Sequence, residues 1–161
     1  IQRITSTEIH NNYLGKGIQN EIIQLLSNKI KCHILTELKR AKYYSIILDC
    51  TPDISHKEQM TVTFRFVTAS ESFGVAVSEH FVDFLEFHST TGANMTEVLF
   101  KMLQELEVNI DDMRGQGYDN GANMRGQHNG VQDKVRQQNR RAFFVQCSAH
   151  SLNLVLKDAA N

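Results

Sequence analysis

Four stretches of the chain place apolar residues at every third or fourth position, which is the spacing of an amphipathic helix. The first covers residues 17–42 and could break near Ser27 and Asn28. The second covers residues 91–106, with a threonine as its expected N-cap. The last two predicted helices have apolar stripes formed by Val131 and Val135, and by Leu152, Val155, Leu156 and Ala159.

Strand patterns lie between these helices. Residues 43–48 are rich in β-branched and aromatic side chains, and Pro52 is expected to stop their ladder. Residues 60–67 alternate apolar residues with Thr and Arg, and residues 74–84 show a similar strand pattern after a short turn. The two segments together predict a hairpin. In total the pattern predicts five strands, at residues 43–48, 60–67, 74–84, 113–118 and 142–146.

The order of these elements predicts an α/β fold with a mixed sheet. Three consecutive strands form an antiparallel meander, and right-handed crossovers through helices place the last two strands parallel to the first. The carboxyl ends of the parallel strands then share one edge, where sheets flanked by helices bind ligands. Asp49 and Asp119 each follow a predicted strand, so they are expected together at that edge, exposed in turns.

The composition is that of an ordinary globular domain. The 161 residues are 41% hydrophobic, and 17 Lys and Arg nearly balance 18 Asp and Glu. No apolar run approaches the roughly 20 residues that span a bilayer, which excludes membrane spanning. Three widely spaced cysteines make no disulfide framework, so a reducing compartment is expected. The first residue is Ile, which suggests that the sequence begins inside a larger polypeptide.

Charge is distributed unevenly along the chain. Residues 1–48 carry seven Lys or Arg against three acids, residues 49–112 three against twelve, and residues 113–141 six against two. The acidic middle could hold a cation beside a phosphate-contacting surface, or it could be a solvated face. The basic residues that follow Asp119 could steer a nucleic-acid backbone or form a solvated helix face; they are Arg125, Lys134, Arg136, Arg140 and Arg141.

Asp49 and Asp119 are the main candidates for chemistry. Two carboxylates from separate strands can hold a hard divalent cation and leave positions open for phosphate oxygens. Acidic residues at strand ends are also common turn formers and helix caps, which is the structural alternative for each of them. Weaker candidates, for which a turn or surface role is favoured, are Asp53, Asp111 and Asp112.

The Cys147-x-x-His150 motif permits several interpretations. It could be half of a zinc site with Cys32 and His33, or a cysteine nucleophile with His150 as its base. A buried cysteine followed by a hydrogen-bonded histidine at a helix start is the favoured interpretation. The glycines from Gly115 to Gly121 lack the spacing of a dinucleotide-binding loop.

Three segments in order carry a resemblance to a known family. They are YYSIILDCTPD (residues 43–53), GQGYDNGANMRGQHNG (115–130) and CSAHSLNL (147–154). Together they resemble the catalytic core of hAT-superfamily DNA transposases, and most of all the branch found in zinc-finger MYM-type-like proteins and their accompanying domain of unknown function. The chain then divides into a helical lead-in, residues 1–42, and a partial core, residues 43–161.

The resemblance implies an RNase H-like core that cuts DNA and joins strands with Mg²⁺ or Mn²⁺. By position, Asp49 corresponds to the first acidic metal ligand and Asp119 to the second, while Cys147 and His150 fill a supporting C/D-x-x-H signature. The family's third ligand is a Glu on a late helix, expected beyond Asn161. The core is therefore expected to be truncated before its last catalytic helix, to bind metal weakly and to be inactive alone.

Two functions follow as expectations. The first is a fragment of a hAT-type transposase whose intact form acts on DNA, with possible homo-oligomer formation through segments outside this chain. The second is a domesticated nuclear module that retains the fold for protein or DNA interaction without catalysis. A nuclear location is expected in either case. Exposed apolar surface is expected as well, because part of a core leaves sheet and helix faces uncovered.

Overall fold

The computed structural model describes residues 15–52, 58–70, 74–87, 89–119, 121–126 and 129–159. The chain forms two compact units, residues 1–34 and 35–161. The division of the chain into a lead-in, residues 1–42, and a core, residues 43–161, stays a prediction.

Helix α2 (Lys16–Ala41) passes through the unit boundary without interruption. The break that the sequence allowed near Ser27 and Asn28 does not occur. The side-chain amide of Gln24 donates to Asn28 Oδ1, one turn away, at 3.0 Å, so Asn28 does not compete for the helix backbone. The helix ends at Ala41, and the next residue, Lys42, has a φ of 64° in the left-handed region that commonly follows a helix terminus.

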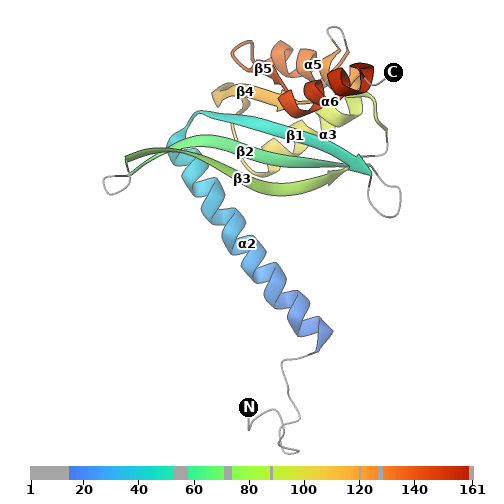
Figure 1. Ribbon diagram of the computed structural model, residues 1–161. Helices are drawn as coiled ribbons and strands as arrows, with labels where there is room; N and C mark the ends of the chain where they lie inside the picture. The colour runs from blue at the N-terminus through green and yellow to red at the C-terminus, as the bar shows by residue number, and fades with distance from the viewer. Residues whose placement is uncertain are drawn as a thin grey trace, which may run out of the picture. The chain divides into compact units, whose positions relative to one another are not determined.

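The second unit is built on a five-stranded mixed sheet with the order β3-β2-β1-β4-β5 (Figure 1). The first three strands form an antiparallel meander, and β4 and β5 run parallel to β1. The predicted fold class is therefore confirmed. The strands are β1 (Tyr44–Pro52), β2 (Glu58–Ser70), β3 (Gly74–Glu86), β4 (Met113–Tyr118) and β5 (Phe143–Gln146).

Strand β1 continues through Pro52, which is in register with Glu58 of β2. The expectation that Pro52 stops the ladder is wrong, and the reason is its position. Beyond Ile47 the pairing with β4 ends, so the last residues of β1 have a recorded strand neighbour on one side only. A proline is tolerated on such an unpaired edge because its missing N–H costs no ladder bond.

The helices of this unit are short. Helix α3 (Gly92–Glu105) begins behind the predicted threonine cap, as the Thr91 side chain accepts a hydrogen bond from Asn94 N. The single helix expected after Asp119 is instead two helices joined through Gly126 and Gly130, and the reason is tight backbone packing at these glycines. The remaining elements are η1 (Ile110–Asp112), α4 (Ala122–Arg125), α5 (Val131–Gln138) and α6 (Ser148–Ala159).

The core lies on one face of the sheet. Side chains such as Ile46, Val62 and Phe64 are fully buried there, with Leu99 of α3 and Val135 of α5. Figure 1 shows α3 behind the sheet in this view. No described helix is long and apolar enough to cross a membrane.

The opposite face of the sheet is largely open. Phe81 and Phe84 of β3 are about half exposed and contact each other with tilted rings, whose centroids lie 4.8 Å apart. Val67 and Val77 lie on the same face, and α6 adds further exposed apolar side chains such as Val155. The expectation of exposed apolar surface is therefore confirmed for the described residues.

Candidate functional site

Register brings the two predicted carboxylates together. Strands β1 and β4 pair in parallel up to Ile47 opposite Gly117. Asp49 and Asp119 each lie two residues further along, so a continuation of this register places them on the same face, just beyond the end of the paired region. Both carboxylates line one cavity, and both raise the pKa of the Cys50 thiol.

The two carboxylates are held differently. Asp119 follows the last residue of β4, and its Oδ1 accepts a hydrogen bond from Gly121 N at 3.0 Å. Asp119 is therefore a turn former as well as a candidate ligand. The structural role that the sequence also allowed, that of a turn residue, is thus present. Asp49 does not lie in a turn as expected. It is exposed within β1, opposite Thr61, because the ladder with β2 continues beyond it.

A cavity of about 840 Å³ opens on the face that these carboxylates share. Its floor lies on β1, β4 and β5, and Gly115 and Gly117 contribute no side chains to it. Gly117 hollows the sheet surface between the flanking side chains of Ile47 and Val145, while the Ser45 hydroxyl lies over Gly115. The polar and titratable side chains around the cavity are Ser45, Asp49, Cys50, Arg65, Gln116, Tyr118, Asp119, Gln146, Cys147 and His150.

The predicted supporting motif also belongs to this cavity. Cys147 follows β5 and donates its backbone N–H to Tyr118 O at 2.9 Å, beside Asp119. Its carbonyl accepts hydrogen bonds from Ser151 N at 3.1 Å and Ser151 Oγ at 3.0 Å, and His150 lines the cavity from α6. Cys147 is exposed, so the buried-cysteine interpretation is wrong.

The zinc and nucleophile interpretations gain no geometric support. Among the residues that the structure describes, no three His, Cys, Asp or Glu side chains are grouped to hold a metal ion. Cys32 and His33 belong to the first unit. Of the weaker candidates, Asp111 and Asp112 lie in η1, while Asp53 falls outside the described residues.

The five predicted basic residues are divided between two places. Arg125 closes α4, shortly after Asp119, and Lys134 borders a small hollow beside Gly126 and Gly130. Arg140 and Arg141 follow α5 and lie at the other end of β4. Asn139, just before them, donates its amide to Met113 O, the first residue of β4, at 2.8 Å. Arg136, in the last turn of α5, completes the set.

Sequence reasoning missed three buried polar residues that support β4. Tyr118 donates its hydroxyl to Gln116 Oε1 at 2.5 Å, and Gln116 Nε2 donates to Ala142 O at 2.9 Å. Burial raises the pKa of Tyr118 above its usual value, so the phenol stays protonated. Asn139 is the third residue, only 3% exposed. None had a sequence signal, because each is an isolated polar residue in a short segment.

Cys50 provides a pH-dependent test of this edge. Its pKa is raised to about 12, first by burial and then by the charges of Asp119, Asp49 and Glu58. The thiolate is the nucleophile in alkylation, so Cys50 should react with iodoacetamide far more slowly than exposed Cys147 at about pH 8.5. Mass spectrometry of a Cys32→Ser variant measures both rates. Equal rates would contradict the predicted environment.

The raised pKa of Cys50 also makes the stability of the fold depend on pH. The folded chain holds the Cys50 proton more tightly than the unfolded chain, whose thiol has the ordinary pKa of 9.0. The stabilising contribution is therefore complete below pH 9.0 and is lost as the pH rises towards about 12.

The strand order, the parallel second half of the sheet and the flanking helices define an RNase-like α/β domain. Residues 2–130 match the DUF4371 family, described as the ZMYM1/FAM200 RNase-like domain, and the chain belongs to this family.

Two curated relatives cover nearly all of the chain. The human protein named "52 kDa repressor of the inhibitor of the protein kinase" is 23% identical over 155 residues, which cover 96% of this chain and 20% of the human protein. The mouse protein of the same name is 22% identical over 152 residues, covering 94% and 20%. The chain thus spans about a fifth of the length of these relatives.

Proposed function

We propose that this domain is part of a hAT-type transposase core whose carboxylate edge keeps two ligands of a divalent-metal site. The observation that carries the proposal is the common register of β1 and β4, which makes Asp49 and Asp119 neighbours on one face. The resemblance of three sequence segments to hAT transposases supports the same assignment.

The donor chemistry fits Mg²⁺ or Mn²⁺. Both ions prefer oxygen ligands, and Mg²⁺ commonly uses one or two carboxylates together with water and substrate phosphate. Asp49 and Asp119 would hold the ion, and the open cavity beside them leaves space for a phosphodiester. When bound, the metal would stabilise the charge on the phosphate oxygens during attack by water or a 3′-hydroxyl.

The residues of this chain would position the substrate. Asp119 is fixed by its hydrogen bond from Gly121 N, whereas exposed Asp49 can adjust to the ion. The open surface over Gly117 lets a DNA backbone approach the sheet closely. With only two carboxylates in this site, we expect weak metal binding and no strand cleavage by the isolated chain.

A second function is favoured by the open apolar face. Phe81 and Phe84 expose about half of their surface on the same face as Val67 and Val77, with the Arg65–Glu79 ion pair between the two groups. Exposed apolar patches mark interaction sites. The two relatives are named as repressors, which fits a domesticated regulatory module in the nucleus. In this alternative the fold serves protein or DNA interaction, and the carboxylates have no catalytic role.

Metal titration distinguishes the two functions. We expect Mg²⁺ or Mn²⁺ to bind the folded chain saturably, and Asp49→Asn and Asp119→Asn each to abolish that binding in calorimetry or NMR. Glu97→Gln is the matched control, because Glu97 is exposed on α3 and does not line the cavity that Asp49 and Asp119 share. A folded chain that binds no metal would overturn the metal-site proposal and favour the interaction module.

A further inference from the structure

The amino-terminal edge of the parallel strands carries cations and exposed aromatic rings. We call these residues the basic edge. They come from the segments that enter β1, β4 and β5, so they lie at the end of the strands opposite to Asp49 and Asp119. The basic edge consists of Lys42, Tyr43, Arg114, Arg140, Arg141 and Phe143.

A β-bulge places the central arginine of this edge. Tyr44 is in register with Met113, and Ser45 with Gly115, so Arg114 between them has no partner on β1. Bulges insert one unpaired residue and redirect its side chain. The guanidinium of Arg114 lies over the ring of Tyr43, with Cζ 4.1 Å from the ring centroid.

Two guanidinium groups converge on one carbonyl. Arg114 Nη1 donates to Asp111 O at 2.8 Å and to Met113 O at 3.0 Å. Arg141 Nη2 donates to the same Asp111 oxygen at 3.2 Å. The shared acceptor holds two like charges close together, and each group keeps further N–H donors that these bonds do not use.

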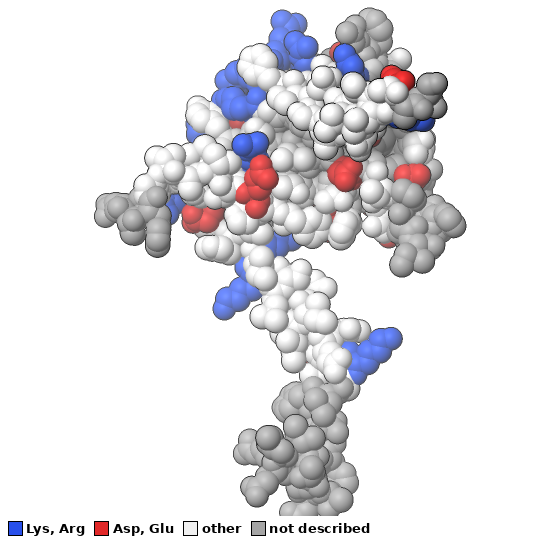
Figure 2. All heavy atoms as spheres, in the orientation of Figure 1, with Lys and Arg blue, Asp and Glu red and all other residues white. Residues whose placement is uncertain are grey.

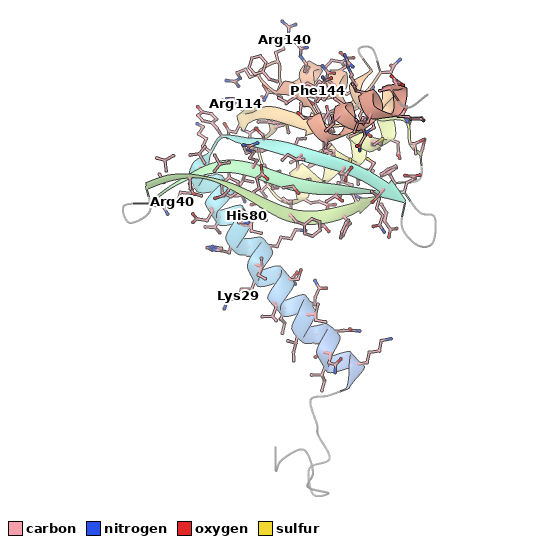
Figure 3. The ribbon with its side chains drawn as sticks, viewed as in Figure 1. Lys29, Arg40, His80, Arg114, Arg140 and Phe144 are labelled. Atoms are coloured by element: carbon pink, nitrogen blue, oxygen red, sulfur yellow. The ribbon has the colours of Figure 1, made fainter. Side chains whose placement is uncertain are left out.

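The positive charge of the basic edge is not neutralised by ion pairs. Among the described residues, Lys42, Arg114, Arg140 and Arg141 form no salt bridge. Nearby Lys39 is paired with Glu107 at 3.2 Å, and Arg40 with Glu37 at 4.0 Å. The acidic residues next to the basic edge are Asp111 and Asp112 of η1. The four cations of the basic edge outnumber these two carboxylates. Figure 2 shows basic side chains along the upper left border, where Figure 3 labels Arg114 and Arg140.

Aromatic rings alternate with these cations. Tyr43 is 50% exposed and Phe143 is 71% exposed, although both are large side chains that normally become buried. Phe143 is in register with Gly115, immediately after the bulge, so its ring stands beside a position without a side chain. Exposed rings interspersed with fixed cations are the combination that binds single strands, through base stacking and phosphate contacts.

We propose that the basic edge binds single-stranded nucleic acid. Arg114 and Arg141 contact successive backbone phosphates, and Phe143 stacks on a base. The planar guanidinium groups suit phosphate oxygens, which accept two parallel N–H bonds. This surface is separate from the carboxylate edge and goes beyond the proposed function, because it requires neither metal nor catalysis.

The test measures binding of a fluorescent oligothymidylate by anisotropy over a range of salt concentrations. The double variant Arg114→Ala/Arg141→Ala should bind about tenfold or more weakly near 0.1 M salt. Its slope of log affinity against log salt should become shallower by about 0.7 for each lost phosphate contact. Phe143→Ala, which removes an exposed ring, should weaken binding about fivefold or more by loss of stacking.

The matched control is Lys16→Ala/Lys29→Ala, which removes the same charge from exposed positions on α2 and should bind like the unchanged chain. Binding is measured without added Mg²⁺ or Mn²⁺, so failure of the metal site leaves this result unaffected. Circular dichroism verifies that every variant folds. The proposal is overturned if the folded chain binds no oligothymidylate, or if the control loses as much affinity as the arginine variant. The proposal is also overturned if polyglutamate displaces the labelled oligothymidylate as well as unlabelled oligothymidylate does, and Phe143→Ala leaves the affinity unchanged.

Discussion

Replacing Gly130 with alanine is expected to lower the free energy of unfolding by about 3 kcal/mol, the upper end of the cost of overpacking. A Cβ at this position would lie 2.5 Å from Gly126 N, 2.7 Å from Gly126 O and 2.9 Å from Met124 O. All three are backbone atoms, which cannot move aside as a side chain can. Urea denaturation of the two proteins measures the difference.

The same change at Gly117 is the matched control. A Cβ there would find its nearest neighbours at 3.6–3.9 Å, which is ordinary van der Waals contact. Gly117→Ala should therefore be nearly neutral, or slightly stabilising because alanine restricts the unfolded chain. Equal losses of stability in the two variants would show that the packing between α4 and α5 is looser than described.

Asn139→Ala should destabilise the fold by about 2–4 kcal/mol, since one side chain satisfies several buried backbone groups. Its amide donates to Ile110 O at 2.7 Å and Met113 O at 2.8 Å, and its Oδ1 accepts from Arg141 N at 2.9 Å. Alanine can replace none of these bonds. The loss should appear as a lower urea midpoint with an unchanged slope, which indicates reduced stability rather than a less compact state.

Gln137→Ala serves as the control for this change. Gln137 is exposed and, within the described part of the chain, its side chain donates a hydrogen bond only to Asp133 Oδ2, one turn earlier on α5, at 2.8 Å. Its removal should cost a few tenths of a kcal/mol, the usual value of such helix-surface pairs. A comparable loss in both variants would mean that Asn139 contributes no more than helix propensity.

Much of the fold was predictable because its elements are regular. The alternation of Val62, Phe64 and Phe66 with polar residues defined a half-buried strand, and the helix behind Thr91 had both its cap and its apolar stripe. The crossover rule then placed β4 and β5 parallel to β1. Errors arose where three-dimensional context overrides a local rule, as at Pro52, which occupies an unpaired portion of β1.

The site was predictable only in part. Both carboxylates could be assigned to one edge, since parallel strands end together, but the register that makes Asp49 and Asp119 neighbours requires the position of the bulge. Residues such as Asn139 act through contacts with carbonyls almost thirty positions away in the chain, as with Ile110. Neither composition nor spacing can reveal such partners.

The bulge at Arg114 has an evolutionary consequence. Because this residue has no partner on β1, a deletion that removes it would rejoin Met113 and Gly115 opposite consecutive residues of β1 and leave the downstream pairing in place. An insertion elsewhere in β4 would instead turn Asp119 to the other face of the sheet. Length variation among related genes should therefore accumulate at this position, where a lineage can gain or lose the arginine without changing the register of β4 against β1 further along.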